Sequence, residues 1–555
     1  MPRCSTIATI PPVPAPTLDP PQLRDPTPEP ANGGILGLIE RLGNRLPDPW
    51  LLFLIGLAIV MVISQIGESA RWSVQASVVE GGKTVTRVLQ PVGLLDSEGI
   101  YWVFSSLIVN MLRFPPLGIV LVGMLAVGVA EKTGLITALL KVMLKVTPAK
   151  LLTPALVFVG TMSSLGSDAG YVVLPPIAAV LFLAVGRSPI VGVAAVFAGI
   201  AGGFGANLAI TGSDAILASF TQTAADFAHQ GYRVSATCNW YFSMTATLLV
   251  TLVGWGVTAW IVEPRFAARP PELGGPAPAG DHAAHAHMQV VDAVERRGLF
   301  WSGLAFLLAL GWVVAMILIP GMPLHSTGAA PTLAGTPGAV GPRWINAIVP
   351  ILFFVFIIPG LVYGVATRQI RSDKDIGRIM ADSMAQLAPV IVLAFFAAQF
   401  IEAFRYSNLG PMLATAGGRW ISTLGLPKGV LLIVFIFFVA SLDLLISSMS
   451  AKYAFVSPVF VPMFMTGAGI SPELTQAAYR LADSCTNVIT PVNAYLVIIL
   501  AVMRRYMPAA GMGTMMALML PYCIAILISW TALLQVWIWL DIPLGPAGPL
   551  HYPSK

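Results

Sequence analysis

Charged side chains are scarce in this sequence. Asp, Glu, Lys and Arg together make up 10% of the 555 residues, whereas soluble globular domains carry about 25%. Hydrophobic residues make up 56%, and most apolar runs are about 20 residues long, the length of a membrane-spanning helix. This composition excludes an ordinary soluble domain and indicates a multi-pass membrane protein.

Cysteine and catalytic motifs are equally sparse. Cys4, Cys238, Cys485 and Cys523 are scattered along the chain, so we expect no disulfide framework. The sequence lacks the GxxxxGK[ST] and HExxH patterns, which argues against ATP hydrolysis and against a zinc protease. We therefore expect no enzyme, no catalytic residues and no organic cofactor. The formal net charge of +5 is spread over short loops, which favours a role in membrane topology over nucleic-acid binding.

Composition divides the chain into two apolar halves, 36–263 and 299–545, each expected to hold a re-entrant hairpin. Residues 1–35 are Pro-rich and predict a disordered tail, and residues 546–555 form a short C-terminal tail. The polar linker 264–298 carries several arginines, as does the segment after residue 366, so the positive-inside rule places both in the cytoplasm. Three linker histidines suggest an unstructured loop more than a metal site: His282, His285 and His287.

Helical spans are expected where apolar residues run without charge. These ranges are 51–66, 117–130, 240–262, 299–319, 345–366, 387–404 and 515–540. Val/Thr alternation within 67–91 predicts a small β-hairpin. Residues 135–146 have apolar positions at helical spacing and predict an interfacial helix, with Lys141 and Lys145 in water.

One polar stretch, Ser441 to Tyr495, lies between apolar segments and organises the rest of the chain. Exposed backbone is not tolerated in lipid, so interrupted helices at membrane depth line protein-enclosed cavities. Ionisable side chains at that depth usually mark a substrate or ion path. The stretch therefore predicts half of a transport site.

The two halves echo each other at polar positions. Ser167 precedes Pro175 at the same spacing as Ser450 precedes Pro458. Further along, the pair Asn207 and Thr211 interrupts an apolar run, as do Asn487 and Thr490. Such recurrence is typical of repeat transporters, in which freed carbonyls and Ser, Thr and Asn oxygens suit Na⁺, while helix N-termini suit anions.

Several motifs together resemble the AbgT family, the p-aminobenzoyl-glutamate transporters, some of which export drugs and antimetabolites. The matching runs are Glu40-Arg-Leu-Gly-Asn, Gly128-Val-Ala-Glu-Lys-Thr-Gly134, Asp168-Ala-Gly-Tyr-Val-Val173, Phe395-Phe-Ala-Ala-Gln399-Phe and Ala477-Ala-Tyr-Arg480 with Asp483-Ser and Ile489-Thr-Pro491. The resemblance covers nearly the whole chain.

The resemblance implies an all-α polytopic membrane protein with about nine transmembrane helices, two re-entrant helical hairpins and an inverted repeat of discontinuous helices. It implies a homodimer in the lipid of the bacterial inner membrane. The implied function is secondary active transport of small aromatic or carboxylate solutes, with export of sulfonamide antimetabolites by proton-coupled antiport. An alternative is a Na⁺-coupled uptake carrier for dicarboxylates or p-aminobenzoyl-glutamate. H⁺ or Na⁺ is then the coupling ion.

The candidate site joins residues carried over from the family with residues chosen for their chemistry. The resemblance carries over Asp214, Ser450, Pro472, Arg480, Asp483 and Pro491. The residues themselves add Asn207, Asp443, Tyr453, Asn487 and Thr490, with Ser167, Asp168, Thr211 and Lys452 as secondary positions. A Na⁺ site is expected near Ser167, Asn207 and Asn487.

Each charged candidate has a functional and a structural interpretation. The planar donor fork of Arg480 suits a carboxylate, or it pairs with Asp483 three positions along. Asp214 and Asp483 are candidate proton carriers, because desolvation favours the neutral form of a carboxylic acid, or they hold unwound backbone.

Three positions depart from the family pattern, which has Asn, Gln and Trp where this chain has Asp443, Lys452 and Tyr453. The first two changes add opposite charges, so we predict that Asp443 and Lys452 interact. Tyr453 either stacks on an aromatic substrate or belongs to the core. In the first hairpin, Ser164-Leu165 replaces the expected Asn-Thr.

Overall fold

The computed structural model describes residues 49–80, 83–145, 148–166, 169–276, 292–325, 343–493 and 495–552. The predictions for the tail 1–35, for Ser167 and Asp168, and for the three linker histidines lie outside these residues. The described chain is mostly helical, with a single two-stranded hairpin, which confirms the predicted fold class.

Apolar runs without charge form the long helices, as expected. Six described helices have the length and hydropathy of a membrane span, and the number rises to eight if each of two sharply bent helix pairs counts as one. The six are α2 (Pro49–Ser69), α10 (Trp240–Val257, continued by a π-helical turn and α11 to Ala267), α13 (Ala293–Leu318), α15 (Ile348–Ala366), α17 (Ala388–Tyr406) and α23 (Met512–Trp539). The expected total of nine spans stays a prediction.

The remaining α-helices of the described chain do not meet the criteria for a single straight span. They are α3 (Ser97–Leu112), α4 (Pro115–Lys132), α5 (Leu135–Lys145), α6 (Leu152–Met162), α7 (Ala169–Ala184), α8 (Pro189–Gly202), α9 (Gly212–Ala225), α14 (Arg343–Asn346), α16 (Asp373–Gln386), α18 (Leu409–Thr423), α19 (Lys428–Asp443), α20 (Met449–Ala468), α21 (Pro472–Asn487) and α22 (Leu496–Arg504). The predicted β-hairpin is confirmed: β1 (Val74–Glu80) and β2 (Lys83–Leu89) pair antiparallel, with Val74 opposite Leu89.

The order of elements around the breaks recurs in the two sequence halves. α6 is followed by a 3-10 turn at Ser163–Gly166 before α7 begins, and residues 444–448 separate α19 from α20. Each pair is followed by a short helix, α8 or α21, whose residues are all buried. Each short helix stops at a break, which covers residues 203–211 after α8 and begins with residues 488–493 after α21. This is the arrangement that the repeated polar positions predicted.

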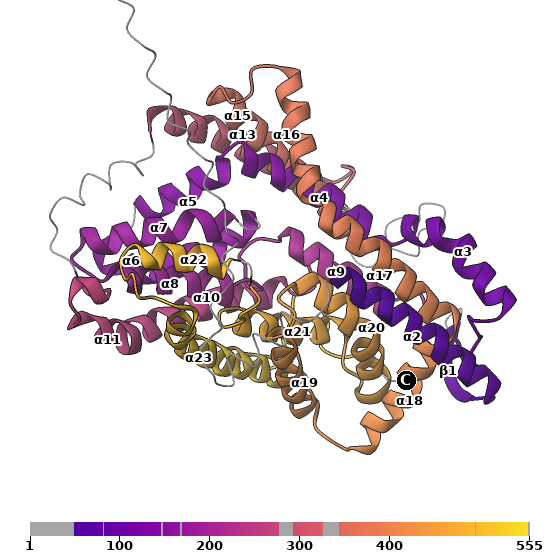
Figure 1. The fold of residues 1–555 in the computed structure, drawn as a ribbon. Helices are drawn as coiled ribbons and strands as arrows, with labels where there is room; N and C mark the ends of the chain where they lie inside the picture. Colours follow the sequence, from indigo (N-terminus) through magenta and orange to yellow (C-terminus); the bar gives the residue numbers. More distant parts are fainter. Residues whose placement is uncertain are drawn as a thin grey trace, which may run out of the picture.

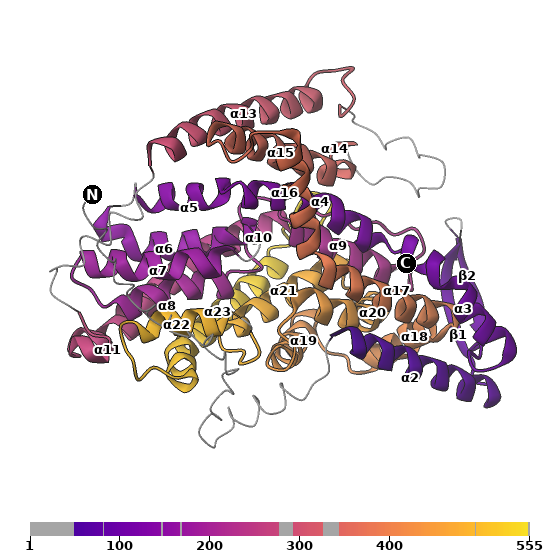
Figure 2. The same ribbon diagram turned by 45° about the horizontal axis from the view of Figure 1, so that its top comes forward.

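The sequence halves are not separate bodies in space. In Figures 1 and 2, helices α6, α7, α8 and α22 lie at one end of the molecule, and helices α2, α17 and α18 with the β-hairpin lie at the other. α4 packs along α15, α2 along α17, α9 along α20, and α10 along α23. Each of these contacts joins an early helix to a late one, so the site is built across the halves.

Lys141 corrects one expectation about the amphipathic helix α5. Instead of lying in water, its Nζ donates to Glu295 Oε1 of α13 at 2.7 Å, with 21% of the side chain exposed. The prediction that this lysine lies in water is therefore wrong. Its ion pair with Glu295 joins α5 to the spanning helix α13.

Candidate functional site

A buried ion pair joins the two interrupted regions. Arg480 lies in α21 and donates through Nη1 to Asp214 Oδ1 in the first turn of α9. The other oxygen of Asp214 accepts from the backbone N–H of Thr211 at 2.6 Å and from its hydroxyl at 2.7 Å, so the carboxylate closes a capping box. The N-terminus of a helix is a favourable place for this negative charge.

Arg480 has more N–H donors than the described residues around it provide acceptors. Its side chain is 3% exposed, and Nε and Nη2 have no hydrogen-bond partner among the described residues. The alternative pairing of Arg480 with Asp483, predicted from their spacing, is wrong. Arg480 pairs with Asp214, and Asp483 pairs with Lys452. Two buried N–H groups without acceptors are costly in an apolar surrounding, and a bound carboxylate would satisfy them.

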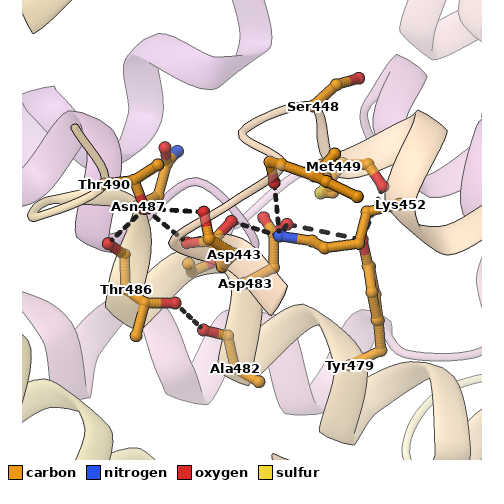
Figure 3. Close-up of polar contacts among 12 residues, drawn as sticks. Asp443, Ser448, Met449, Lys452, Tyr479, Ala482, Asp483, Thr486, Asn487 and Thr490 are labelled. Carbon is orange, nitrogen blue, oxygen red and sulfur yellow. Dashed lines mark hydrogen bonds and ion pairs between the residues drawn. The ribbon is translucent and has the colours of Figure 1, made fainter. Parts of the chain in front are cut away.

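A second charged cluster lies at the tip of the α19–α20 hairpin, and Figure 3 shows its ammonium group between two carboxylates. Lys452 Nζ contacts Asp443 Oδ1 and lies 2.8 Å from Asp483 Oδ1. The three side chains are 0–1% exposed. The predicted interaction between Asp443 and Lys452 is therefore present, and Asp483 is a third member that the sequence did not indicate.

The same cluster joins three pieces of backbone. Asp443 ends α19, Lys452 lies in the first turns of α20, and Asp483 lies in α21. Thr490, in the break after α21, donates to Asp443 Oδ2 at 3.0 Å (Figure 3). Tyr479 donates to the carbonyl of Met449 at 2.6 Å. The hairpin tip and the interrupted helix are thus bound into one unit.

A cavity of about 360 Å³ opens beside these breaks. Small-molecule sites usually enclose about 300–1,000 Å³. Its walls come from both hairpin turns, both interrupted regions and α4. The lining residues are Val127, Ser164, Leu165, Tyr171, Phe204, Gly212, Ser213, Ile216, Ser447, Ser448, Met449, Ser450, Asn487, Asn493 and Tyr495.

Two tyrosines in this cavity were missed by the sequence analysis. Tyr171 of α7 and Tyr495, from the break before α22, stack with ring centroids 4.3 Å apart and an interplanar angle of 10°. Aromatic rings in membrane helices are common, so nothing in either local sequence marked this pair. Their stack gives the cavity an aromatic wall, which suits an aromatic ligand.

Some of the predicted site residues line the cavity, and others contact the residues that line it. Ser450 and Asn487 line the cavity, and Asn207 reaches its wall by accepting from the Ser164 hydroxyl at 3.0 Å. Thr211 also reaches it, because its hydroxyl lies 2.7 Å from that of Ser213. The ion pair of Arg480 and Asp214 therefore lies directly behind this wall.

Tyr453 and the two prolines do not line the cavity. Tyr453 is fully buried; its hydroxyl lies 2.6 Å from that of Thr221, and its ring packs on Tyr479 with centroids 4.3 Å apart. This is the core position that the sequence left as an alternative. Pro472 begins α21, where a missing N–H costs nothing, and Pro491 lies in the following break.

The amide oxygens proposed for Na⁺ already have protein donors. Asn207 Oδ1 accepts from Ser164, and Asn487 Oδ1 accepts from Asn493 Nδ2 at 3.0 Å. Each oxygen has a second lone pair, and the neighbouring breaks add carbonyls and hydroxyls, so the chemistry of the donors fits a hard cation. Ser167 lies outside the described residues.

A cavity lined by two interrupted helical regions, in a chain whose described residues hold six to eight candidate membrane spans, is the arrangement expected of a membrane transporter. A family model described as "AbgT putative transporter family" matches residues 34–552, and the chain belongs to the AbgT family.

Individual relatives agree with this assignment over nearly their full lengths. The p-aminobenzoyl-glutamate transport protein of Escherichia coli (strain K12) is 33% identical over 520 residues, which cover 93% of this chain and 96% of that protein. The solved structure of the YdaH transporter of Alcanivorax borkumensis is 37% identical, with a TM-score of 0.79, and covers 90% of this chain and 100% of its own. MtrF of Neisseria gonorrhoeae, described with a class of antimetabolite efflux pumps, is 37% identical with a TM-score of 0.84, covering 93% and 100%.

Proposed function

We propose that this protein is a secondary active transporter of small aromatic carboxylates of the p-aminobenzoyl-glutamate type, and that it exports these solutes and sulfonamide antimetabolites in exchange for protons. The substrate class rests on the name of the Escherichia coli relative and the direction on the description of MtrF. We place it in the bacterial inner membrane as a homodimer, in keeping with the family resemblance.

The observation that carries the proposal is the pair of unused donors on Arg480. A guanidinium that is 3% exposed and holds one carboxylate through Nη1 has Nε and Nη2 left for a second. The substrate carboxylate would satisfy them after passing the wall of Thr211 and Ser213, while its aminobenzoyl ring would lie against the stacked tyrosines 171 and 495.

The cluster of Asp443, Lys452 and Asp483 supplies a place for the coupling proton. Two carboxylates share one ammonium group, so the cluster carries one negative charge that no described cation balances. Binding of one proton makes the cluster neutral, which lowers the cost of holding it away from water. Because Asp483 and Arg480 lie in the same helix, proton binding and substrate binding act on one element, α21.

Purified protein in proteoliposomes tests the proposal directly. We expect uptake of labelled p-aminobenzoyl-glutamate to follow an imposed pH gradient, and Arg480→Ala to abolish both binding and transport. Arg419→Ala is the matched control, because Arg419 is exposed and donates only to the carbonyl of Gln75 at 2.6 Å in the described structure. Unchanged binding in Arg480→Ala would refute the role of the buried guanidinium.

A Na⁺-coupled uptake carrier is the second candidate, favoured by the asparagine oxygens beside the cavity. The same vesicles separate the two mechanisms. Accumulation driven by a Na⁺ gradient at equal pH on both sides would support the second candidate and refute proton antiport.

A further inference from the structure

A second cavity, of about 670 Å³, lies against a different face of α9 from the central one. α9 forms the wall between them. Ser213 and Ile216 face the central cavity, while Ala218, Ser219 and Gln222 face the second. At about 100° of rotation per residue, the two sets lie on adjacent faces of the same helix, with Ile216 and Ser219 at the edge between them. A solute in the second cavity is separated from the substrate site by one helix.

The second cavity is basic. Its charged lining residues are Arg87, Arg233, Arg405 and a single carboxylate, Asp226. Arg233 and Arg405 each have a buried Nε without a hydrogen-bond partner among the described residues. Arg405 Nη1 lies 3.8 Å from Glu402 Oε1, which is too long for a hydrogen bond. Arg233 and Arg405 thus each retain an N–H group for an anion.

The loop that carries Arg233 is fixed in place. Gln222 of α9 accepts from the backbone N–H of Val234 at 2.8 Å and donates to the carbonyl of Tyr232. Both bonds flank Arg233, so a buried amide holds the backbone on each side of this cavity-lining residue. Asp226 accepts from the backbone N–H of Gly231 at 3.3 Å, which closes the same loop. Such prior ordering reduces the entropy lost when a ligand binds.

We propose that this cavity is a second binding site for organic dicarboxylates, in which Arg233 and Arg405 hold the carboxylates of the solute before or after it occupies the central cavity. Planar guanidinium groups bind carboxylates through paired hydrogen bonds, which suits a glutamate-like dianion better than a neutral ring. The identity of the physiological solute rests on the proposed function; the dicarboxylate chemistry of the site rests on the arginines alone.

Calorimetric titration of the full chain in lipid nanodiscs with glutarate tests this site. We expect two classes of binding in the unmodified protein. Arg233→Gln should weaken one class about tenfold, the effect of losing a charged hydrogen bond at a partly exposed site, and leave the other unchanged. Arg480→Gln should affect the opposite class, and Arg419→Gln neither. Arg233→Lys keeps the positive charge and should weaken the same class less, which covers the case in which Arg233→Gln does not fold.

The outcomes for the two proposals are distinct. A single class of glutarate sites, or two classes that both survive Arg233→Gln and Arg233→Lys, overturns the second site and leaves the central one intact. If p-aminobenzoyl-glutamate binds nowhere while glutarate binding depends on Arg233, the proposed substrate is wrong and the second site stands.

Discussion

Removing the ammonium group from the buried cluster gives the sharpest test of how this site is held together. Lys452→Gln leaves Asp443 and Asp483 without their cation, and all three side chains are 0–1% exposed. At an effective dielectric constant of about 20, an ion pair at the 2.8 Å separation of Lys452 and Asp483 is worth about 6 kcal/mol. Desolvation offsets part of this, so the expected loss of unfolding free energy is about 3–5 kcal/mol.

The partner variants have different expected costs because they leave different charges. Asp443→Asn leaves a neutral pair of Lys452 and Asp483 and should cost only about 1–2 kcal/mol. The double variant leaves one carboxylate alone and should lie between the two single variants. Its cost should therefore fall at least about 1 kcal/mol below the sum of the single costs.

Unfolding of the purified protein in mixed micelles, followed by tryptophan fluorescence during an SDS titration, measures these free energies. Additive losses in the double variant, or an Asp443→Asn variant less stable than Lys452→Gln, would refute the shared cluster.

Three further predictions follow from the packing. Tyr171→Leu should weaken binding of an aromatic substrate about fivefold by removing half of the aromatic wall, while Tyr171→Phe should bind normally in the same titration. Gly199→Ala places a methyl group 2.2 Å from the backbone oxygen of Val157 and should cost about 1–3 kcal/mol; equal stability in the SDS titration would show that α6 and α8 separate easily. Arg187 binds Glu263 through two hydrogen bonds of 2.6 and 2.7 Å, so Arg187→Lys should lower the unfolding free energy by about 1 kcal/mol, whereas Arg187→Ala should lower it more.

The sequence predicted the helical architecture because bilayer thickness and backbone chemistry leave few alternatives. Apolar runs of sufficient length became helices, and breaks appeared where Gly, Ser and Asn interrupt them, as at residues 203–211. The interaction of Asp443 with Lys452 was also predictable, since two added charges of opposite sign within one apolar hairpin would otherwise be costly.

The partners of Arg480 and Asp483 were not predictable from local spacing. Three positions apart on one helix, they satisfy the usual rule for an ion pair. That rule describes isolated helices. Here Asp214 of α9 pairs with Arg480, and Lys452 of α20 pairs with Asp483. The stack of Tyr171 and Tyr495 was missed for the same reason, because it depends on two breaks meeting in space.

The packing of early helices against late ones limits how this protein can be recombined. α2 lies along α17, and α9 lies along α20, so a cut in the linker would separate partners instead of modules. A chimera that takes residues 49–276 from one relative and the remainder from another must match surfaces on every one of these pairs. A substitution on the contact face of one helix in such a pair therefore requires a compatible side chain from the other half of the chain.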